Sequence, residues 1–213
     1  MKKVIISFIG TDGAGKSTLI AEVQKRLEQQ LKGKVKTVYF GWKPFLPTTK
    51  LLSFILRKKN YQIADKMNSK NNNSFSEENK LHLFQEIMLS YYYLEYLSRY
   101  IFQLRISSFK SIMLVDRYFY DLYAHYEYAK QSYVFPILLK MMPKPDLIFL
   151  LDVDVQTAKK RKPEMDLELL QKHHLHYQQL SSLINAKVVK TDLSLEQSLQ
   201  QVLELSAEII NKK

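Results

Sequence analysis

Short apolar runs alternate with segments of helical periodicity along this chain of 213 residues. Residues 111–115 and 147–151 are apolar almost throughout, which is typical of strands covered on both faces. The predicted strands are residues 4–9, 35–40, 111–115, 147–151 and 186–190. The first predicted helix ends near residue 31, and a capping box at residues 194–197 opens the last one. The helices predicted between them are residues 48–57, 77–106, 119–131, 155–162 and 164–184. This alternation predicts an α/β fold with a parallel sheet.

The region between the second and third predicted strands departs from this alternation. Residues 60–76 are polar and are expected to form a loop. The helix predicted for residues 77–106 is apolar over most of its circumference, which implies burial on two sides. Eleven of the fourteen tyrosines lie between Tyr91 and Tyr133. Most of these rings are expected to pack in the core, and the others to line a polar cavity.

Residues 10–18 read Gly-Thr-Asp-Gly-Ala-Gly-Lys-Ser-Thr, which matches the pattern of a phosphate-binding loop. The chain has only five glycines, and three of them fall in this stretch, where the backbone must approach an anion closely. Successive backbone N–H groups of such a loop surround phosphate oxygens, and the helix that follows adds further donors. Lys16 is expected to bridge the β- and γ-phosphates, Ser17 to bind Mg²⁺, and Thr18 to contact the α-phosphate. The nucleotide-binding residues predicted in the loop are Gly10, Asp12, Gly13, Ala14, Gly15, Lys16, Ser17 and Thr18.

Composition narrows the class of protein further. Because the chain has no cysteine, disulfides and thiolate metal sites are excluded. No apolar run approaches the roughly 18 residues of a membrane span, and the first run leads into the phosphate loop, so we expect no signal peptide and a cytoplasmic protein. The net charge of +11 would suit nucleic acid, an anionic membrane surface or small polyanionic substrates. Because the basic residues are scattered and no recognisable nucleic-acid module accompanies them, we expect no specific nucleic-acid partner.

Four motifs in sequence order resemble those of thymidylate kinases, and more closely those of the thymidylate kinase-like branch of P-loop phosphotransferases. They are residues 10–19, Asp116-Arg117-Tyr118, residues 145–154 and residues 189–192. The resemblance implies one three-layer P-loop kinase domain over residues 1–213, with a five-stranded parallel sheet flanked by helices. It also implies a helical region on the acceptor side at about residues 44–108 and a short lid at about residues 156–166.

The resemblance implies an enzyme that moves the γ-phosphoryl group of ATP, with Mg²⁺, to a nucleoside monophosphate such as dTMP. Catalysis in such enzymes is positioning plus electrostatic stabilisation. Arg117 would contact phosphate between donor and acceptor, Asp116 would organise the water shell of the metal or the acceptor, and Asp12 would face the acceptor. In the lid, Arg161 would bind phosphate through both arms of its guanidinium, and Asp192 would border the adenine. The predicted catalytic residues are Lys16, Asp116, Arg117 and Arg161, and the predicted metal ligands are Ser17 and Asp116.

The acceptor side departs from the thymidylate kinase pattern. The family carries an arginine after the second strand, whereas residues 40–47 contain none and Lys43 is their only cation. The family also carries an arginine on the long helix. Residues 89–96 have none, and Arg99 is the nearest candidate. The predicted acceptor-binding residues are Asp12, Lys43, Tyr92, Arg99, Arg117 and Tyr118. The resemblance further implies a possible homodimer through the helix at residues 77–106.

Other interpretations remain beside this one. A kinase of the same fold for a phosphorylated sugar or a nucleoside is the nearest, although residues 40–50 lack the glutamate that related nucleoside kinases use. A GTP-dependent switch would need Asn-Lys-x-Asp, and residues 79–82 end in histidine instead. A basic nucleic-acid-binding P-loop protein is a third alternative, motivated by the net charge. His173 and His176 share a helix face, which is expected to be exposed and polar rather than a metal site.

Overall fold

The computed structural model describes residues 3–31, 35–41, 75–106, 111–192 and 194–212. Five strands form one parallel sheet in the order β2-β3-β1-β4-β5. The strands are β1 (Val4–Ile9), β2 (Val35–Tyr39), β3 (Ile112–Asp116), β4 (Leu147–Asp152) and β5 (Lys187–Lys190). All five predicted strands are therefore confirmed, with ends that differ by one residue at most.

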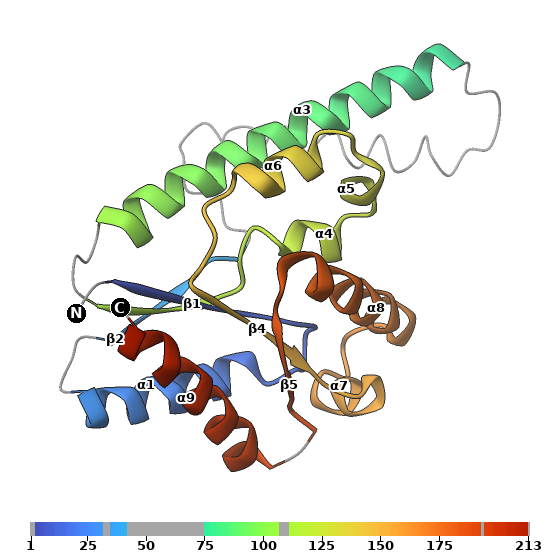
Figure 1. Cartoon of the computed structure of the whole chain (residues 1–213). Coiled ribbons are helices and arrows are strands. Elements are labelled where there is room, and N and C mark those ends of the chain that lie inside the picture. The colour runs from blue at the N-terminus through green and yellow to red at the C-terminus, as the bar shows by residue number, and fades with distance from the viewer. Residues whose placement is uncertain (1–2, 32–34, 42–74, 107–110, 193, 213) are drawn as a thin grey trace.

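Helices cover both faces of the sheet. They are α1 (Lys16–Leu31), α3 (Phe75–Arg99), α4 (Asp121–His125), α5 (Glu127–Gln131), α6 (Phe135–Met141), α7 (Val155–Arg161), α8 (Leu167–Ile184) and α9 (Leu195–Lys212), with a π-helical segment at Tyr100–Ile106. Figure 1 shows α1 and α9 on one side of the sheet, and α3, α4 and α6 on the other. The predicted three-layer α/β fold is confirmed.

The side chains of β1 show how the layers are joined. Val4, Ile6 and Phe8 pack with the apolar faces of α1 and α9. Ile5 and Ile9 point the other way and belong to the core that includes rings of α3 and the end of β3. This alternation follows from the two-residue period of a strand, and it explains why a strand covered on both faces reads as an unbroken apolar run.

The helices between β3 and β4 differ from the single helix that the sequence predicts there. The helix predicted for residues 119–131 is two short helices, because Tyr126 between α4 and α5 has an extended backbone with φ −120° and ψ 111°. Helix α6 was not predicted. The hydroxyl of Ser132 accepts a hydrogen bond from the backbone N–H of Phe135 at 2.9 Å at its start, and Pro136 stands in its first turn. The short helix predicted at residues 48–57 and the loop at 60–76 lie outside the described residues, except for the last two loop residues, which begin α3.

The topology brings the chemical motifs to one edge of the sheet. Strand β1 lies between β3 and β4, and Phe8 near the end of β1 is in register with Asp116 at the end of β3. The phosphate loop follows β1, and Arg117 follows β3. In a parallel sheet, ligands bind outside the carboxyl ends of the strands, where the strand order reverses. This arrangement therefore places the loop and the Asp116-Arg117 motif beside each other.

Candidate functional site: a phosphate loop between two cavities

The loop between β1 and α1 has the backbone that its glycines predict. Gly10, Gly13 and Gly15 all have positive φ, at 146°, 85° and 78°. A Cβ atom on Gly13 would lie 2.7 Å from the carbonyl oxygen of Ala158, so only glycine lets α7 pack this closely on the loop. The loop and the first turn of α7 therefore form one packed unit.

The Lys16 ammonium group lies under the loop. Its side chain is buried, and Nζ donates hydrogen bonds to the carbonyl oxygens of Gly10 at 2.8 Å and Thr11 at 2.7 Å. Burial lowers the pKa of Lys16 to about 8, and the nearby Arg117 adds to this shift, while Asp12 opposes it. Burial disfavours the charged form of the ammonium group, and a nearby anion favours it. A phosphate bound at the loop would therefore stabilise the charged form of Lys16.

A cleft of about 540 Å³ opens over the loop. Its lining consists of Asp12, Gly13, Gly15, Lys16, Ser17, Thr18, Tyr39, Asp116, Arg117, Arg161 and Lys162. The structure thus brings most of the predicted donor-site residues together in one cavity, and it adds Tyr39 and Lys162. Gly10 and Ala14 are buried in the loop and are not among the residues that line this cleft.

The cleft contains oxygen atoms that fit a magnesium ion. The Ser17 hydroxyl lies 3.5 Å from Oδ2 of Asp116, and Oδ1 of Asp116 is buried without a hydrogen-bond partner in the described structure. Burial raises the pKa of Asp116, against the opposing effect of Lys16. A hydroxyl and a carboxylate are oxygen ligands of the kind that Mg²⁺ prefers. The described residues contain no group of three or more His, Cys, Asp or Glu that could hold a metal, so an ion here would keep several water or phosphate ligands.

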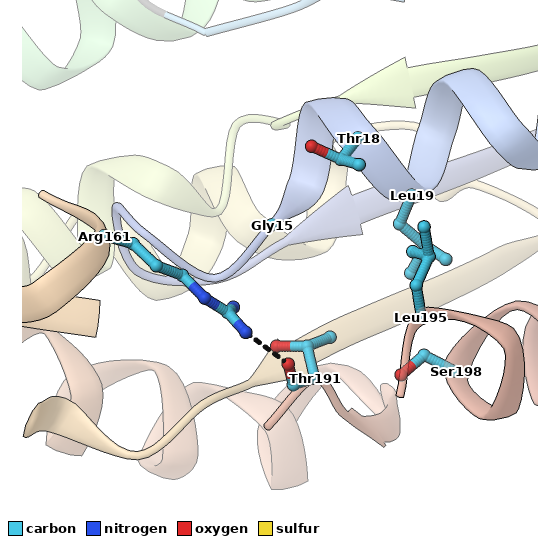
Figure 2. Close-up of a pocket in the computed structure, with 7 residues that line it drawn as sticks. All are labelled: Gly15, Thr18, Leu19, Arg161, Thr191, Leu195 and Ser198. Carbon is cyan, nitrogen blue, oxygen red and sulfur yellow. Dashed lines mark hydrogen bonds between the residues drawn. The ribbon is translucent and has the colours of Figure 1, made fainter. Parts of the chain in front are cut away.

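A second cavity, of about 250 Å³, lies on the other side of Gly15 (Figure 2). Its lining consists of Gly15, Thr18, Leu19, Arg161, Thr191, Leu195 and Ser198. The guanidinium of Arg161 joins the two sides of this space, because it donates to the carbonyl oxygen of Gly13 at 3.2 Å and to that of Thr191 at 2.9 Å. Leu19 and Leu195 lie together at one end of this space and Arg161 lies at the other, so the cavity has an apolar part and a polar part (Figure 2).

Arg117 lines the large cleft beside Asp12 of the loop. It follows the last residue of β3 with a positive φ of 70°, which is uncommon for a residue with a side chain. Its guanidinium pairs with Asp12, donates to Oδ2 of Asp121 at 2.8 Å and lies 3.1 Å from Nε2 of His125. Burial alone would lower the pKa of Arg117, but Asp121 and Asp12 raise it, so the group stays charged.

A third cavity, of about 170 Å³, lies behind Arg117. It is lined by Tyr39, Tyr96, Arg117, Asp121, Leu122, His125 and Tyr126. Tyr39 and Arg117 also line the large cleft, so the two spaces adjoin at these side chains. The site therefore consists of a phosphate cleft with one smaller cavity on either side.

Comparison with solved structures identifies the architecture. A crystal structure of thymidylate kinase from Ehrlichia chaffeensis matches this chain with a TM-score of 0.55 and 17% identity, over 96% of this chain and 99% of that one. The chain has a thymidylate kinase-like P-loop fold. No family model and no curated protein matches it. At this level of identity the likeness concerns the fold, so the chemistry must be argued from the side chains.

Several residues predicted from the thymidylate kinase resemblance occupy other places in the fold. Arg99 is buried, and its guanidinium donates to the carbonyl oxygens of Gly41 at 2.8 Å and Tyr39 at 3.0 Å. Tyr118 is fully buried and donates its hydroxyl proton to the carbonyl oxygen of Pro143. Among the described residues, neither side chain lines one of the three cavities, so the structure does not bring Arg99 or Tyr118 together with the residues of the cleft, and their role at the acceptor stays a prediction.

The remaining predicted residues lie at the margins of the site. The ring of Tyr92 is 6.3 Å from that of Tyr126, which places it one side chain behind the third cavity. Asp192 is exposed, and the turn after β5 contributes Thr191 to the described lining of the second cavity. Lys43 lies outside the described residues.

Sequence reasoning missed a cluster of polar side chains next to Arg117, of which all but His125 are buried. It consists of Asp121, His125, His173 and Tyr177. The prediction that His173 and His176 form an exposed face is wrong, because both are buried. His173 packs edge-on against the ring of His125, with centroids 4.3 Å apart. One sequence signal was available, since Asp121 follows Arg117 by four residues at the start of a predicted helix.

No described helix of the protein is both long enough and apolar enough to cross a membrane.

Proposed function

We propose that the protein is an ATP- and Mg²⁺-dependent phosphotransferase that moves the γ-phosphoryl group of ATP to a nucleoside monophosphate of the dTMP type. The observation that carries this proposal is the single cleft lined by Lys16, Ser17, Asp116 and Arg117. It combines a phosphate-binding loop, two oxygen ligands for a metal and a second cation. This is the set of parts that phosphoryl transfer requires.

In this proposal the chain acts by holding phosphates in line. The backbone N–H groups of the loop and the ammonium of Lys16 bind the β- and γ-phosphates, and Lys16 exchanges its loop carbonyl partners for phosphate oxygens. Mg²⁺ held through Ser17 and Asp116 would neutralise charge on the phosphate oxygens. Arg117 stabilises the charge that spreads over the transferring group. The adenine would enter the second cavity, beside Arg161 and Thr191.

The acceptor is the open part of this proposal. The arginine that lines the third cavity, Arg117, is already paired with Asp12 and Asp121, and Arg99 is turned to backbone carbonyls. This arrangement supports keeping two alternatives to dTMP, namely a phosphorylated sugar and a nucleoside. A nucleic-acid-binding role is the least supported, since the site points to small phosphorylated ligands. We expect such an enzyme to work in the cytoplasm.

An acceptor panel tests the proposal. Mg-ATP would be combined in turn with dTMP, other nucleoside monophosphates, nucleosides and sugar phosphates, and the formation of ADP and of phosphorylated product would be followed. Transfer to dTMP is the expected result. Transfer to another acceptor would retain the reaction class and replace the substrate. A protein that binds Mg-ATP but transfers phosphate to no acceptor in the panel would contradict the proposed activity.

We also propose that two copies pair through α3. Leu83, Ile87 and Leu94 are each more than half exposed and follow one another at spacings of four and seven residues, so they share a helix face. Large exposed apolar faces commonly mark an interface. Light scattering during gel filtration is expected to give a dimer for the native chain and a monomer for Leu94→Glu. The variant Leu183→Glu, at an exposed leucine of α8, is the matched control and should remain dimeric.

A further inference from the structure

The two carboxylates that pair with Arg117 lie in different surroundings. The side chain of Asp121 is 7% exposed, whereas that of Asp12 is 30% exposed. Asp121 belongs to α4, which packs against α8 on the side of the sheet away from α1. Asp12 belongs to the phosphate loop itself. One partner of the arginine is therefore nearly buried, at the wall of the third cavity, and the other lines the cleft that phosphates would enter.

A second buried side chain holds Asp121 in place. The hydroxyl of Tyr177 on α8 donates a hydrogen bond to Oδ1 of Asp121 at 2.8 Å. Tyr177 is 1% exposed, and its ring packs in the main hydrophobic core. Both oxygens of Asp121 are thus engaged, one by the tyrosine and one by Arg117. A carboxylate fixed at both oxygens restrains its partner more strongly than an exposed carboxylate on a loop.

The path of the Arg117 side chain is also constrained. A Cβ atom added to Gly41 would lie 2.6 Å from Cδ of Arg117, so the arginine passes directly against the backbone at the end of β2. Gly41 therefore limits the space on one side of the arginine, whose guanidinium extends to Asp121 and lines the cleft. Placement of a charge to within about 1 Å matters in phosphoryl transfer, because the arginine acts only where the negative charge develops.

We infer that Asp121, held by Tyr177, is the positioning residue for Arg117, and that Asp12 is the exchangeable partner that an entering phosphate displaces. This inference rests on the proposed function. Asp121 lines the third cavity beside the cleft, and in this arrangement it acts on the transferred phosphate through the arginine. The tyrosine connects that arginine to α8, the helix that follows α7 and the lid segment.

Four variants test the inference. Asp121→Asn keeps the shape of the side chain but removes its charge, and Tyr177→Phe removes one hydroxyl from a side chain that otherwise stays packed. Asp12→Asn alters the exchangeable partner. Asp146→Asn is the control, because Asp146 is another partly buried carboxylate, which accepts the backbone N–H of Ile5 at 2.8 Å at the opposite end of the sheet.

The first readout is kinetic. Asp121→Asn is expected to lower kcat by about 10²-fold while the Kd for ATP changes less than threefold, since a misplaced arginine costs transition-state stabilisation. Tyr177→Phe should lower kcat by several-fold, and the double variant should be little worse than Asp121→Asn, because both act through one group. Asp146→Asn should lower the unfolding midpoint without lowering kcat. A loss of kcat in Asp146→Asn equal to that in Asp121→Asn would show a general stability effect and overturn the inference.

The second readout does not depend on activity. Nuclear magnetic resonance of the arginine side-chain Nε–H groups would follow Arg117, with Arg117→Lys used for assignment. The Arg117 signal should be rigid in the native chain and in Asp12→Asn, and mobile in Asp121→Asn. If the native chain transfers no phosphate, the proposed function fails, and this measurement still decides the inference. A rigid Arg117 in both Asp121→Asn and Tyr177→Phe would overturn it.

Discussion

The Ser17 hydroxyl lies 3.5 Å from Oδ2 of Asp116, which joins the first turn of α1 to the end of β3. These residues are 99 positions apart and meet because β1 and β3 are neighbours with Phe8 and Asp116 in register. The other oxygen of Asp116 is buried and has no hydrogen-bond partner in the described chain. An unpartnered buried carboxylate oxygen beside a hydroxyl is costly to the fold, and a cation with its water shell would satisfy it.

This relationship predicts how Mg²⁺ dependence responds to Asp116→Asn. The amide keeps the size of the side chain but loses the charge that attracts the ion or orders its waters. The Mg²⁺ concentration needed for half-maximal ATP turnover should rise by about 10-fold or more. Glu28→Gln is the matched control, because Glu28 is an exposed acid of α1. Equal Mg²⁺ dependence in the native chain and Asp116→Asn would remove Asp116 from the metal site.

Lys16→Ala tests the donor site. The ammonium is buried and bonded to loop carbonyls, so its removal leaves a site without its central cation. Phosphoryl transfer should fall by at least about 10²- to 10³-fold, while circular dichroism and the chain's oligomeric state stay as in the native protein. Lys25→Ala, at an exposed lysine of the same helix, should keep full activity. Normal turnover by Lys16→Ala would contradict the assignment of the phosphate site.

Arg161→Ala tests whether the second cavity receives the nucleotide. Arg161 bridges the Gly13 and Thr191 carbonyls and lines both the cleft and the second cavity. Its loss should weaken the binding of ATP and ADP by about 10-fold and also lower kcat, because in the proposed function Arg161 contacts phosphate both in the bound state and in the transition state. Titration calorimetry of ADP measures the first effect. Lys160 is the exposed neighbour of Arg161 on α7, and Lys160→Ala should leave the nucleotide affinity and kcat unchanged. An equal effect of the two substitutions would mean that Arg161 contributes only general positive charge.

Much of the donor half of the site could be predicted from the sequence, for two physical reasons. Strands that are buried on both faces have unbroken apolar sequences, so the positions of β1 and β3, and of the residues that follow each strand, could be predicted. A phosphate loop needs glycines at fixed spacing, and Gly13 is irreplaceable here because α7 packs on it. These two facts locate Lys16 and Arg117 without any knowledge of side-chain packing.

The acceptor half could not be predicted in the same way, because it depends on where long side chains turn. Arg99 was a reasonable ligand by position, yet its guanidinium stacks on Phe40, with Cζ 4.8 Å from the ring centroid, and binds the carbonyls at the end of β2. Tyr177 is flanked in the sequence of α8 by other polar residues, and nothing in that sequence marks it as a partner of Asp121. The two side chains meet only because α8 packs on α4. A helical period gives the face of a residue and leaves its partner in another element undetermined.

The burial of the histidines behind Arg117 also could not be predicted from the sequence, and it makes the stability of the fold depend on pH. His173 is buried against His125, and its Nδ1 has no hydrogen-bond partner in the described structure. Burial lowers the pKa of His173 to about 4, and the neighbouring His125 adds to the shift, while Asp12 opposes it. Burial also lowers the pKa of His125. Both rings are therefore neutral in the folded protein near pH 7.

The free energy of unfolding should consequently fall as the solution is acidified. In the unfolded chain His173 takes up a proton near its ordinary pKa of about 6.5, whereas the folded protein resists this until about pH 4. Between these values the unfolded state binds more protons, so acid favours unfolding, and His173 alone should cost about 2 kcal/mol between pH 7 and pH 5. Urea unfolding at both pH values should show a smaller loss for His173→Leu than for the native chain. Gln179→Leu, at an exposed position of α8, should lose as much as the native chain. An unchanged acid sensitivity in His173→Leu would mean that His173 takes up its proton as readily in the folded protein as in the unfolded chain, and would contradict this prediction.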